Sequence, residues 1–246
     1  MIRKVDFLIV GTQKGGTTAL SNFLSKHPNV IIPVQKELHF FDNEKIFKKR
    51  EIDYKLYHDY FEPKEQRFLS GEATPIYMFW KPAAKRIFEY NPEIKLVFIL
   101  RNPIERAYSN YHQELKKKRE FLSFKNALLA EPVRRILAYP SQSRYHSYIQ
   151  RGYYTKDIKR MMQFFPAKQM LFLKNEELLM NHGQTLNKVF KFLEIPEYNI
   201  IEQKVFSPYQ YPPMRNKDKQ WLQKKFSREI EELENLLCWD LSDWKN

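Results

Sequence analysis

Nearly continuous apolar runs alternate along the first part of the chain with segments whose apolar residues recur at helical spacing. The first run, Val5 to Val10, is typical of a strand buried on both faces. From Thr17 the apolar residues are spaced for one face of a helix, and the dipeptide His27-Pro28 ends that segment. The chain is therefore predicted to open with a strand, a tight loop and a helix.

Further apolar runs predict four more strands. They lie at residues 30–32, 68–73, 95–100 and 170–173, and segments of helical pattern separate them. Alternation of strands and helices is typical of a parallel sheet with both faces covered. We therefore predict an α/β fold with three layers (α/β/α), in which helices flank a central parallel sheet.

The later part of the chain is mainly helical in pattern. Apolar stripes at residues 154–165, 186–193 and 222–237 predict helices that each bury one face. The segment Ile200 to Asn216 holds three prolines and little periodicity, which favours a loop. No repeat or linker marks a boundary, so we predict a single domain over residues 1–246.

Composition narrows the class of protein. The 246 residues include 42 Lys plus Arg against 29 Asp plus Glu, and this net charge of +13 attracts anions of any kind unless it is only a solvated surface. The longest purely apolar run, Leu96 to Leu100, is far too short to span a membrane. The single cysteine, Cys238, cannot form an intrachain disulfide, which favours a reducing compartment and predicts a cytoplasmic protein.

The loop between the first strand and the first helix has the features of a phosphate-binding loop. Compared with the Walker A pattern GxxxxGK[ST], its glycines and Thr18 keep their spacing, but the lysine is at position 14 instead of 17. Backbone N–H groups at such a helix start converge on phosphate. The residues predicted to contact an anionic group are Lys14, Gly15, Gly16, Thr17 and Thr18. The fold is thus P-loop-like, and the alternative is a simple helix cap after a flexible turn.

The strand at 95–100 is followed by an arginine where a magnesium-dependent nucleotidase would place an acidic residue. Arg101 stands at the carboxyl end of this strand, and Ser109 follows about two helical turns later. Ligands of open α/β sheets bind outside the carboxyl ends of the strands. Arg101 and Ser109 are therefore predicted to bind a second phosphate of the same ligand, although a salt-bridged surface arginine remains the alternative.

A third group of polar residues follows the second strand, in the stretch KELHFFD from Lys36 to Asp42. Glu37 and His39 alternate with apolar neighbours, so both side chains are expected on one side of the chain. A carboxylate near a cationic crevice is a candidate base for an acceptor hydroxyl or amine. An ordinary surface glutamate is the alternative interpretation of Glu37.

Together, three motifs in order resemble the sulfotransferases that use 3′-phosphoadenosine 5′-phosphosulfate, in particular the heparan sulfate sulfotransferase type and its bacterial relatives. The motifs are GTQKGGTTAL, KELHFFD and ILRNPIERAYSNY, and further similarity lies in GEATPIY, RGYY, FFP and YPPM. The resemblance covers essentially the whole chain. It implies an enzyme of the 3′-phosphoadenosine 5′-phosphosulfate-dependent sulfotransferase class.

The resemblance also implies roles for the candidate residues. Lys14 and the rest of the loop through Thr18 match the part that holds the 5′-phosphosulfate, while Arg101 and Ser109 match the pair that binds the 3′-phosphate. Glu37 matches the general base and His39 a neighbour that helps to place the acceptor. The acceptor attacks sulfur in line, adenosine 3′,5′-bisphosphate leaves, and no metal is required. The implied partner is a carbohydrate or small natural product with a hydroxyl or amine, with no nucleic acid and no membrane span.

The chain departs from the heparan sulfate type at two points. Ala73 stands where those enzymes usually have a lysine, and one cysteine cannot close their disulfide loop, for which Arg215 and Lys217 are candidate substitutes. Two other functions remain open at this stage: a P-loop kinase-like phosphotransferase and a basic polyanion-binding module. Five aromatic residues could stack on an acceptor or belong to the core: Tyr77, Phe79, Trp80, Tyr145 and Tyr148.

Overall fold

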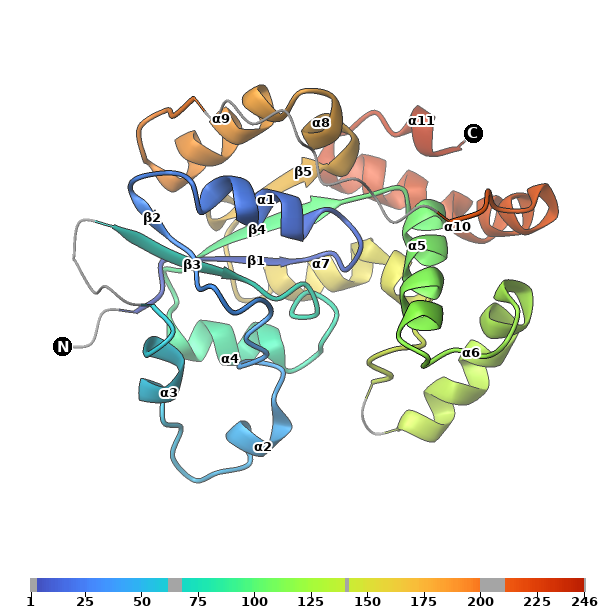
Figure 1. Cartoon of the computed structure of the whole chain (residues 1–246), viewed down its shortest axis with the longest axis horizontal. Helices are drawn as coiled ribbons and strands as arrows, with labels where there is room; N and C mark the ends of the chain where they lie inside the picture. The colour runs from blue at the N-terminus through green and yellow to red at the C-terminus, as the bar shows by residue number, and fades with distance from the viewer. Residues whose placement is uncertain (1–3, 62–67, 140–141, 200–210, 246) are drawn as a thin grey trace. The chain divides into compact units, whose positions relative to one another are not determined.

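A computed structural model of the chain describes residues 4–61, 68–139, 142–199 and 211–245. These residues gather into two compact units, each of which is made of two stretches of the chain. The described residues of Met1–Leu100 and Lys159–Ser207 form the first unit, and those of Arg101–Ile158 and Pro208–Asn246 form the second. Figure 1 shows the elements of both, and each unit is described by itself.

The first unit contains a parallel sheet of five strands in the order β2-β3-β1-β4-β5. The strands are β1 (Phe7–Gly11), β2 (Val30–Ile31), β3 (Leu69–Ala73), β4 (Lys95–Leu100) and β5 (Met170–Lys174). In the centre, Phe7 pairs with Gly71 of β3 on one side and with Lys95 of β4 on the other. The parallel sheet predicted from the apolar runs is confirmed, and each predicted strand lies within two residues of the observed one.

Helices cover both faces of this sheet (Figure 1). On one face lie α1 (Thr17–Leu24), α8 (Asn175–Met180) and α9 (His182–Leu193), and α4 (Ala83–Tyr90) lies on the other. Alternate strand residues such as Ile9 and Ile99 share a buried core with Leu20, Val189 and other apolar residues of those three helices. Successive strand residues point to opposite faces, so a strand covered on both sides is apolar throughout. The predicted three-layer arrangement is confirmed.

A second cluster of the first unit is aromatic and surrounds the chain after β2. Phe40 and Phe41 pack against Tyr57, Tyr77 and one another, with ring centroids 4.7 to 5.5 Å apart. Three short elements complete the unit: α2 (Glu44–Phe47), α3 (Lys55–His58) and the 3-10 turn η2 (Ala167–Gln169). The cluster anchors a segment that otherwise has no regular secondary structure.

The second unit is helical. It contains α5 (Pro103–Lys116), α6 (Phe124–Ala138), the 3-10 turn η1 (Gln150–Gly152), α10 (Asn216–Leu237) and α11 (Ser242–Lys245), and it shares α7 (Tyr154–Met162) with the first unit. The start of α7 is tied to α10, because the backbone N–H of Thr155 donates to Oε1 of Glu229 at 2.7 Å. The helices predicted at 154–165, 186–193 and 222–237 are confirmed, but α7 ends at Met162, and α9 and α10 begin at His182 and Asn216. Of the predicted loop, residues 200–210 lie outside the described residues, 211–215 have no regular structure, and α10 begins at Asn216.

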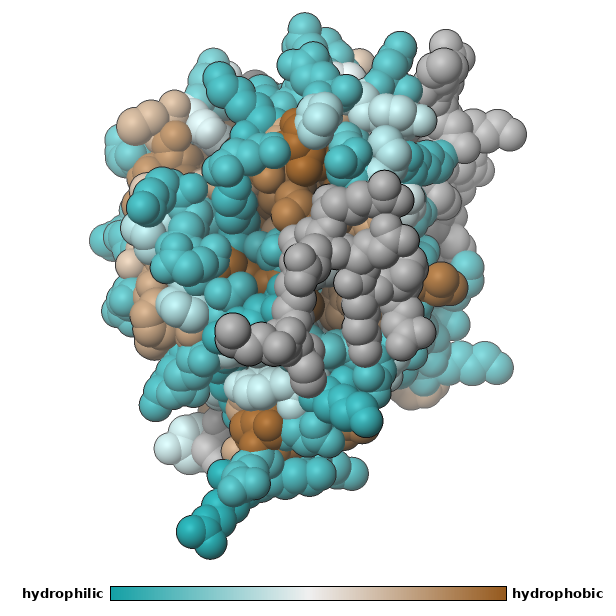
Figure 2. Space-filling view, turned by 90° about the vertical axis from the view of Figure 1, so that its left-hand side faces the viewer, coloured by the Kyte–Doolittle hydropathy of each residue, from teal (hydrophilic) through white to brown (hydrophobic). Residues whose placement is uncertain are grey.

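The face of the protein drawn in Figure 2 is mainly polar. Figure 2 shows one face of the molecule, on which hydrophilic side chains dominate and hydrophobic ones form small patches. Within the described residues, no helix has the length and apolar character needed to cross a membrane.

The prediction of a single domain stays a prediction. The described residues gather into two compact units.

Candidate functional site

The loop after β1 makes a sharp turn that requires glycine at two positions. It begins with Thr12, whose N–H donates to the carbonyl of Ile99 in β4, and it places Lys14 (φ 68°) and Gly16 (φ 104°) in the left-handed region. A Cβ added to Gly15 would lie 2.4 Å from the carbonyl oxygen of Ile99. One added to Gly16 would lie 2.3 Å from Nδ2 of Asn175. Glycine is therefore required at both positions for packing within the protein, and the predicted approach of this backbone to an anionic group stays a prediction.

The N-terminus of α1 has neither a side-chain cap nor a negative charge in its first turn. Its N-cap residue is Gly16, which has no side chain. The N–H groups of a first helical turn have no acceptor within the helix, and the helix dipole favours negative charge there. Thr17 and Thr18 open the helix, with Thr17 buried and Thr18 exposed. These features support the predicted phosphate loop.

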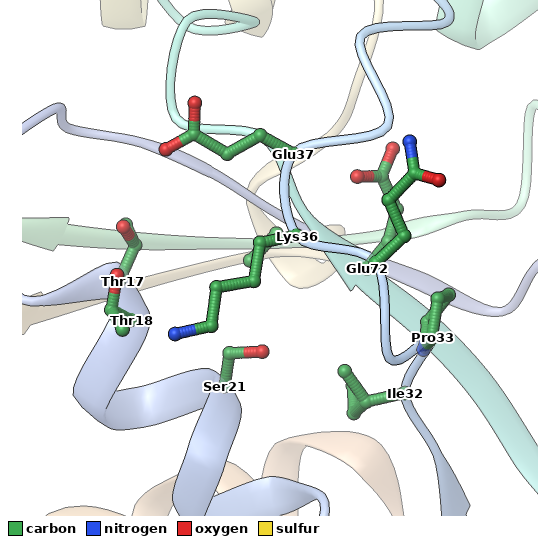
Figure 3. Close-up of a pocket in the computed structure, with 10 residues that line it drawn as sticks. Thr17, Thr18, Ser21, Ile32, Pro33, Lys36, Glu37 and Glu72 are labelled. Carbon is green, nitrogen blue, oxygen red and sulfur yellow. The ribbon is translucent and has the colours of Figure 1, made fainter.

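A pocket adjoins this helix start (Figure 3). Its walls come from α1, from the segment after β2 and from the end of β3. The lining residues include Thr17, Thr18, Ser21, Lys36, Glu37 and Glu72. The structure thus brings the predicted base Glu37 to the same pocket as the two threonines of the predicted phosphate loop. Lys14 is not part of this lining.

Lys36 is a pocket residue that the sequence interpretation did not single out. Figure 3 shows its amine pointing toward Thr18 and Ser21 of α1, while the carboxylate of the next residue, Glu37, points elsewhere. Lys36 and Glu37 therefore place a positive and a negative group in the lining of the same pocket. Basic residues are common on this chain, and nothing in the local sequence distinguishes Lys36 from the others.

Glu37 and His39 form a cluster with a third residue, Asp42. Nε2 of His39 lies 3.4 Å from a carboxylate oxygen of Glu37, and Nδ1 lies 3.0 Å from Oδ2 of Asp42. The hydrogen bond with Asp42, followed by that with Glu37, raises the pKa of His39 to about 9. At neutral pH His39 is therefore a cation between two carboxylates. Glu37 is half exposed, as a group that receives a proton from an acceptor must be, whereas Asp42 is fully buried.

Sequence reasoning missed Asp42, although the residue closes the KELHFFD stretch. A carboxylate three residues after a histidine is a weak signal, because it could equally face solvent. The decisive property of Asp42 is its complete burial, directly after Phe40 and Phe41 of the aromatic cluster.

Glu72 is the second carboxylate that sequence reasoning missed. It is buried at the end of β3 and accepts hydrogen bonds from Thr74 Oγ1 (2.6 Å), Tyr77 OH (2.8 Å) and Tyr57 OH (3.2 Å). Burial raises the pKa of Glu72 to about 7. Glu72 precedes Ala73, the position at which the related enzymes usually have a lysine. Nothing in the sequence at this position predicts the hydrogen bonds of Glu72.

The aromatic candidates for acceptor stacking prove to be mostly core. Tyr77, Phe79, Trp80 and Tyr148 are buried, so their rings are not available as a platform on the surface. Only Tyr145 of this set is exposed, and the guanidinium of Arg119 lies 4.3 Å from its ring centroid. Of the two alternatives that the sequence allowed, the core interpretation is correct for the four buried residues.

Arg101 and Ser109 belong to the second unit. The carbonyl of Arg101 accepts a hydrogen bond from Tyr154 OH at 2.8 Å, and its guanidinium lies 3.8 Å from Glu105. Asn102 then caps α5 by accepting from the N–H of Ile104. Ser109 is a buried residue within the same helix. The shared binding of one phosphate by Arg101 and Ser109 stays a prediction.

Within residues 4–61, 68–139, 142–199 and 211–245, no three His, Cys, Asp or Glu side chains are grouped in a way that could hold a metal ion.

Comparison with known proteins identifies relatives over most of the chain. Residues 4–245 match the family model for the sulfotransferase domain. Heparan sulfate glucosamine 3-O-sulfotransferase 3B1 of Homo sapiens is 32% identical over 188 residues, which are 76% of this chain and 45% of that protein. Heparan sulfate glucosamine 3-O-sulfotransferase 5 of Mus musculus is 28% identical over 201 residues, or 78% and 55% of the two chains. The chain thus spans about half the length of these curated relatives.

Solved structures agree with the sequence comparison. A crystal structure of a sulfotransferase from Alicyclobacillus acidocaldarius has a TM-score of 0.84 and 28% identity, with full coverage of both chains. Mouse sulfotransferase SULT7A1 complexed with PAP has a TM-score of 0.52 at 15% identity, over 80% of this chain and 60% of that one, and shows a likeness of fold alone. Because the family model matches almost every residue and the fold agrees with a solved member, the chain belongs to the sulfotransferase domain family.

Proposed function

We propose that this protein transfers a sulfuryl group from 3′-phosphoadenosine 5′-phosphosulfate to a hydroxyl, or less commonly an amine, of a carbohydrate or small natural product. The observation that carries the proposal is the pocket in which Glu37 meets the uncapped N-terminus of α1. A helix start of this kind binds an anion, and a half-exposed carboxylate across the same hollow can remove a proton from a nucleophile. Transfer of an anionic group to a hydroxyl needs both properties.

The donor would be held mainly by its charged ends. In this proposal Lys14 and the loop through Thr18 bind the 5′-phosphosulfate, and Arg101 and Ser109 of the second unit bind the 3′-phosphate. The close backbone turn at Gly15 and Gly16 supports the first assignment, since a side chain at either position would meet neighbouring atoms. The second assignment rests on residue type and on the place of Arg101 just before the cap of α5.

The transfer itself would be an in-line displacement at sulfur. The acceptor oxygen forms a bond to sulfur while the bond between sulfur and the 5′-phosphate oxygen breaks, and adenosine 3′,5′-bisphosphate leaves. Glu37 takes the proton of the acceptor, and Lys14 stabilises the negative charge that develops on the leaving oxygen. The cationic ring of His39, fixed on its far side by Asp42, orients the carboxylate of Glu37. Positioning and cationic stabilisation supply the catalysis, as in phosphoryl transfer.

A carbohydrate is the acceptor class that the comparisons favour, because the relatives are named for heparan sulfate glucosamine. The exposed amine of Lys36 in the pocket and the net charge of +13 support an acceptor that carries acidic groups.

The proposal is tested by titration calorimetry and a transfer assay on the same preparations. Wild-type protein is titrated with adenosine 3′,5′-bisphosphate, with adenosine 5′-monophosphate and ATP plus magnesium as controls, and transfer from the labelled donor is measured on sulfate-free and partly sulfated glycans. We expect metal-independent binding of the bisphosphate and transfer to at least one acceptor. The Glu37→Gln variant should keep the bisphosphate affinity and lose transfer. Absent bisphosphate binding, or a preference for ATP with magnesium, would overturn the proposal.

A further inference from the structure

The buried carboxylate of Glu72 is connected to the backbone that carries Glu37 and His39. We propose that Glu72 is a positioning residue for the transfer reaction: through the hydroxyls of Tyr77 and Thr74 it fixes the backbone of residues 39–41, and thereby the Glu37–His39 pair. The inference rests on the proposed function, since it assumes that Glu37 acts as the base. It concerns no contact between Glu72 and the acceptor.

The tyrosine hydroxyl is the main connection. Tyr77 OH accepts hydrogen bonds from the N–H groups of Phe40 at 3.0 Å and Phe41 at 3.4 Å, and it donates to Oε1 of Glu72 at 2.8 Å. A phenol has one hydrogen and two acceptor positions. Because Glu72 takes the hydrogen, both acceptor positions of Tyr77 are left for the two backbone N–H groups. The carboxylate therefore decides the direction of every hydrogen bond at this hydroxyl.

The hydroxyl of Thr74 makes the same kind of connection between Glu72 and the N–H of His39, the residue before Phe40. Its Oγ1 donates to the second oxygen of Glu72 at 2.6 Å and accepts from the N–H of His39 at 3.5 Å. Consecutive N–H groups from His39 to Phe41 thus all end on hydroxyls whose hydrogens Glu72 accepts. The two oxygens of one buried carboxylate organise the whole turn.

The segment needs such an anchor because its backbone is in an unfavourable conformation. Glu37 (φ 52°) and His39 (φ 53°) both lie in the left-handed region, which side-chain-bearing L residues rarely adopt. Such conformations persist where the surrounding structure determines them, and they gather at functional sites. The two left-handed residues here are the predicted base and its cationic neighbour. Loss of the anchor would let both relax toward ordinary conformations and move the carboxylate of Glu37.

Tyr57 offers a matched control within the same network. Its hydroxyl donates to the same oxygen of Glu72, at 3.2 Å, and within the described residues no hydrogen bond joins Tyr57 to residues 39–41. Tyr57 and Tyr77 are both fully buried, and each ring packs in the aromatic cluster. Replacing either with phenylalanine keeps the ring and removes one donor to Glu72. Only Tyr77→Phe also removes the acceptor of the backbone N–H groups.

The experiment compares Tyr77→Phe, Tyr57→Phe, Glu72→Gln and the double variant Glu72→Gln with Tyr77→Phe. For Tyr77→Phe we expect kcat to fall about tenfold or more, as for a misplaced catalytic group, while the donor KM and the bisphosphate affinity stay within about twofold. Tyr57→Phe should keep kcat within about twofold. Glu72→Gln should lower kcat, and the double variant should be no slower than the slower of the two single variants, because the connection through Tyr77 can be lost only once. Thr74→Ser, which keeps the hydroxyl, should retain more activity than Thr74→Val.

A second readout is independent of catalysis. Hydrogen exchange of the amides of Phe40 and Phe41 should speed up in Tyr77→Phe and Glu72→Gln but not in Tyr57→Phe. Equal losses of kcat in the two tyrosine variants, unchanged exchange in Tyr77→Phe, or multiplicative losses in the double variant would overturn the inference. If wild-type protein binds the bisphosphate but transfers nothing, the proposed function fails, and the exchange measurement still decides whether Glu72 holds the turn.

Discussion

His39 and Asp42 form an ion pair in which Nδ1 of the imidazole lies 3.0 Å from a carboxylate oxygen that has no exposure to solvent. The pair fixes the orientation of the ring, so that its other nitrogen, Nε2, faces Glu37 at 3.4 Å. The buried carboxylate of Asp42 thus holds the cationic His39 beside the exposed carboxylate of Glu37. The relationship gives the predicted base a fixed neighbour and makes the charge of His39 depend on a residue with no exposure to solvent.

The first prediction concerns the titration of His39. Because Asp42 is the largest cause of its raised pKa, Asp42→Asn should lower the pKa from about 9 toward the ordinary value of 6.5. Glu37→Gln should lower it less. NMR titration of the His39 ring protons measures both shifts. An unchanged pKa in Asp42→Asn would contradict the ion pair.

The same ion pair should appear in the pH dependence of stability. The pKa of His39 is higher in the folded protein than in the unfolded chain, so its contribution is fully present below pH 6.5 and is lost as the pH rises through about 9. The free energy of unfolding of wild-type protein should therefore fall relative to that of Asp42→Asn between pH 6.5 and 9. Urea titrations at several pH values test this, and parallel pH profiles of the two proteins would contradict it.

Glu72 should give a pH effect in a lower range. Its pKa rises from 4.5 to about 7 on folding because the carboxyl is buried, so ionisation favours the unfolded chain. Stability from this group is fully present below pH 4.5 and is lost as the pH rises through about 7, by at most roughly 3 kcal/mol. Glu72→Gln cannot ionise, so its unfolding free energy should fall less than that of wild-type protein over this range. Denaturant titrations from pH 4.5 to 8 measure the difference, and identical slopes would argue against a raised pKa.

Glycine is required at position 16, in the loop after β1, but not at position 183 in α9. Gly16→Ala should lower the free energy of unfolding by about 1–3 kcal/mol, because φ is 104° and the new Cβ meets Asn175, and it should weaken bisphosphate binding at least about tenfold. Gly183→Ala is the matched control. Position 183 lies in α9 with nothing within 4 Å of an added Cβ, so alanine should be neutral or stabilise by up to about 1 kcal/mol. Thermal unfolding and calorimetry measure both, and equal effects would refute the steric argument.

Arg101 should matter for the donor through its position and not merely its charge. Arg101→Ala should weaken binding of adenosine 3′,5′-bisphosphate by about tenfold to a hundredfold, as expected for loss of a charge-assisted hydrogen bond to phosphate. Arg228→Ala, which removes the same charge from an exposed site on α10, should change the affinity less than about twofold. Calorimetry at 0.15 M salt measures both. Equal losses would indicate nonspecific attraction by the basic surface.

The five strands could be predicted because each carries its own signal, whereas their order in the sheet could not. The segment Lys95 to Leu100 is buried on both faces, so its apolar run is unbroken and its predicted ends match β4. Short elements such as α2 and α3 gave no such signal, because a single helical turn is too short to show a period. The division of the residues into two units was likewise invisible, since it depends on contacts between distant stretches of the chain.

The sequence by itself determined the residue types and spacing that indicate a phosphate loop, and it named Glu37 and His39 as candidate reactive residues. Only the tertiary structure decided that Asp42 is buried against His39, and that Glu72 collects the hydroxyls of Tyr57 and Tyr77. The physical reason is that the spacing of apolar residues depends on the local backbone conformation, and a motif reflects the residue types that a local turn or a bound ligand requires. Burial and the choice of charge partner arise when segments far apart in the chain pack together, and these properties set the pKa of each carboxylate and imidazole.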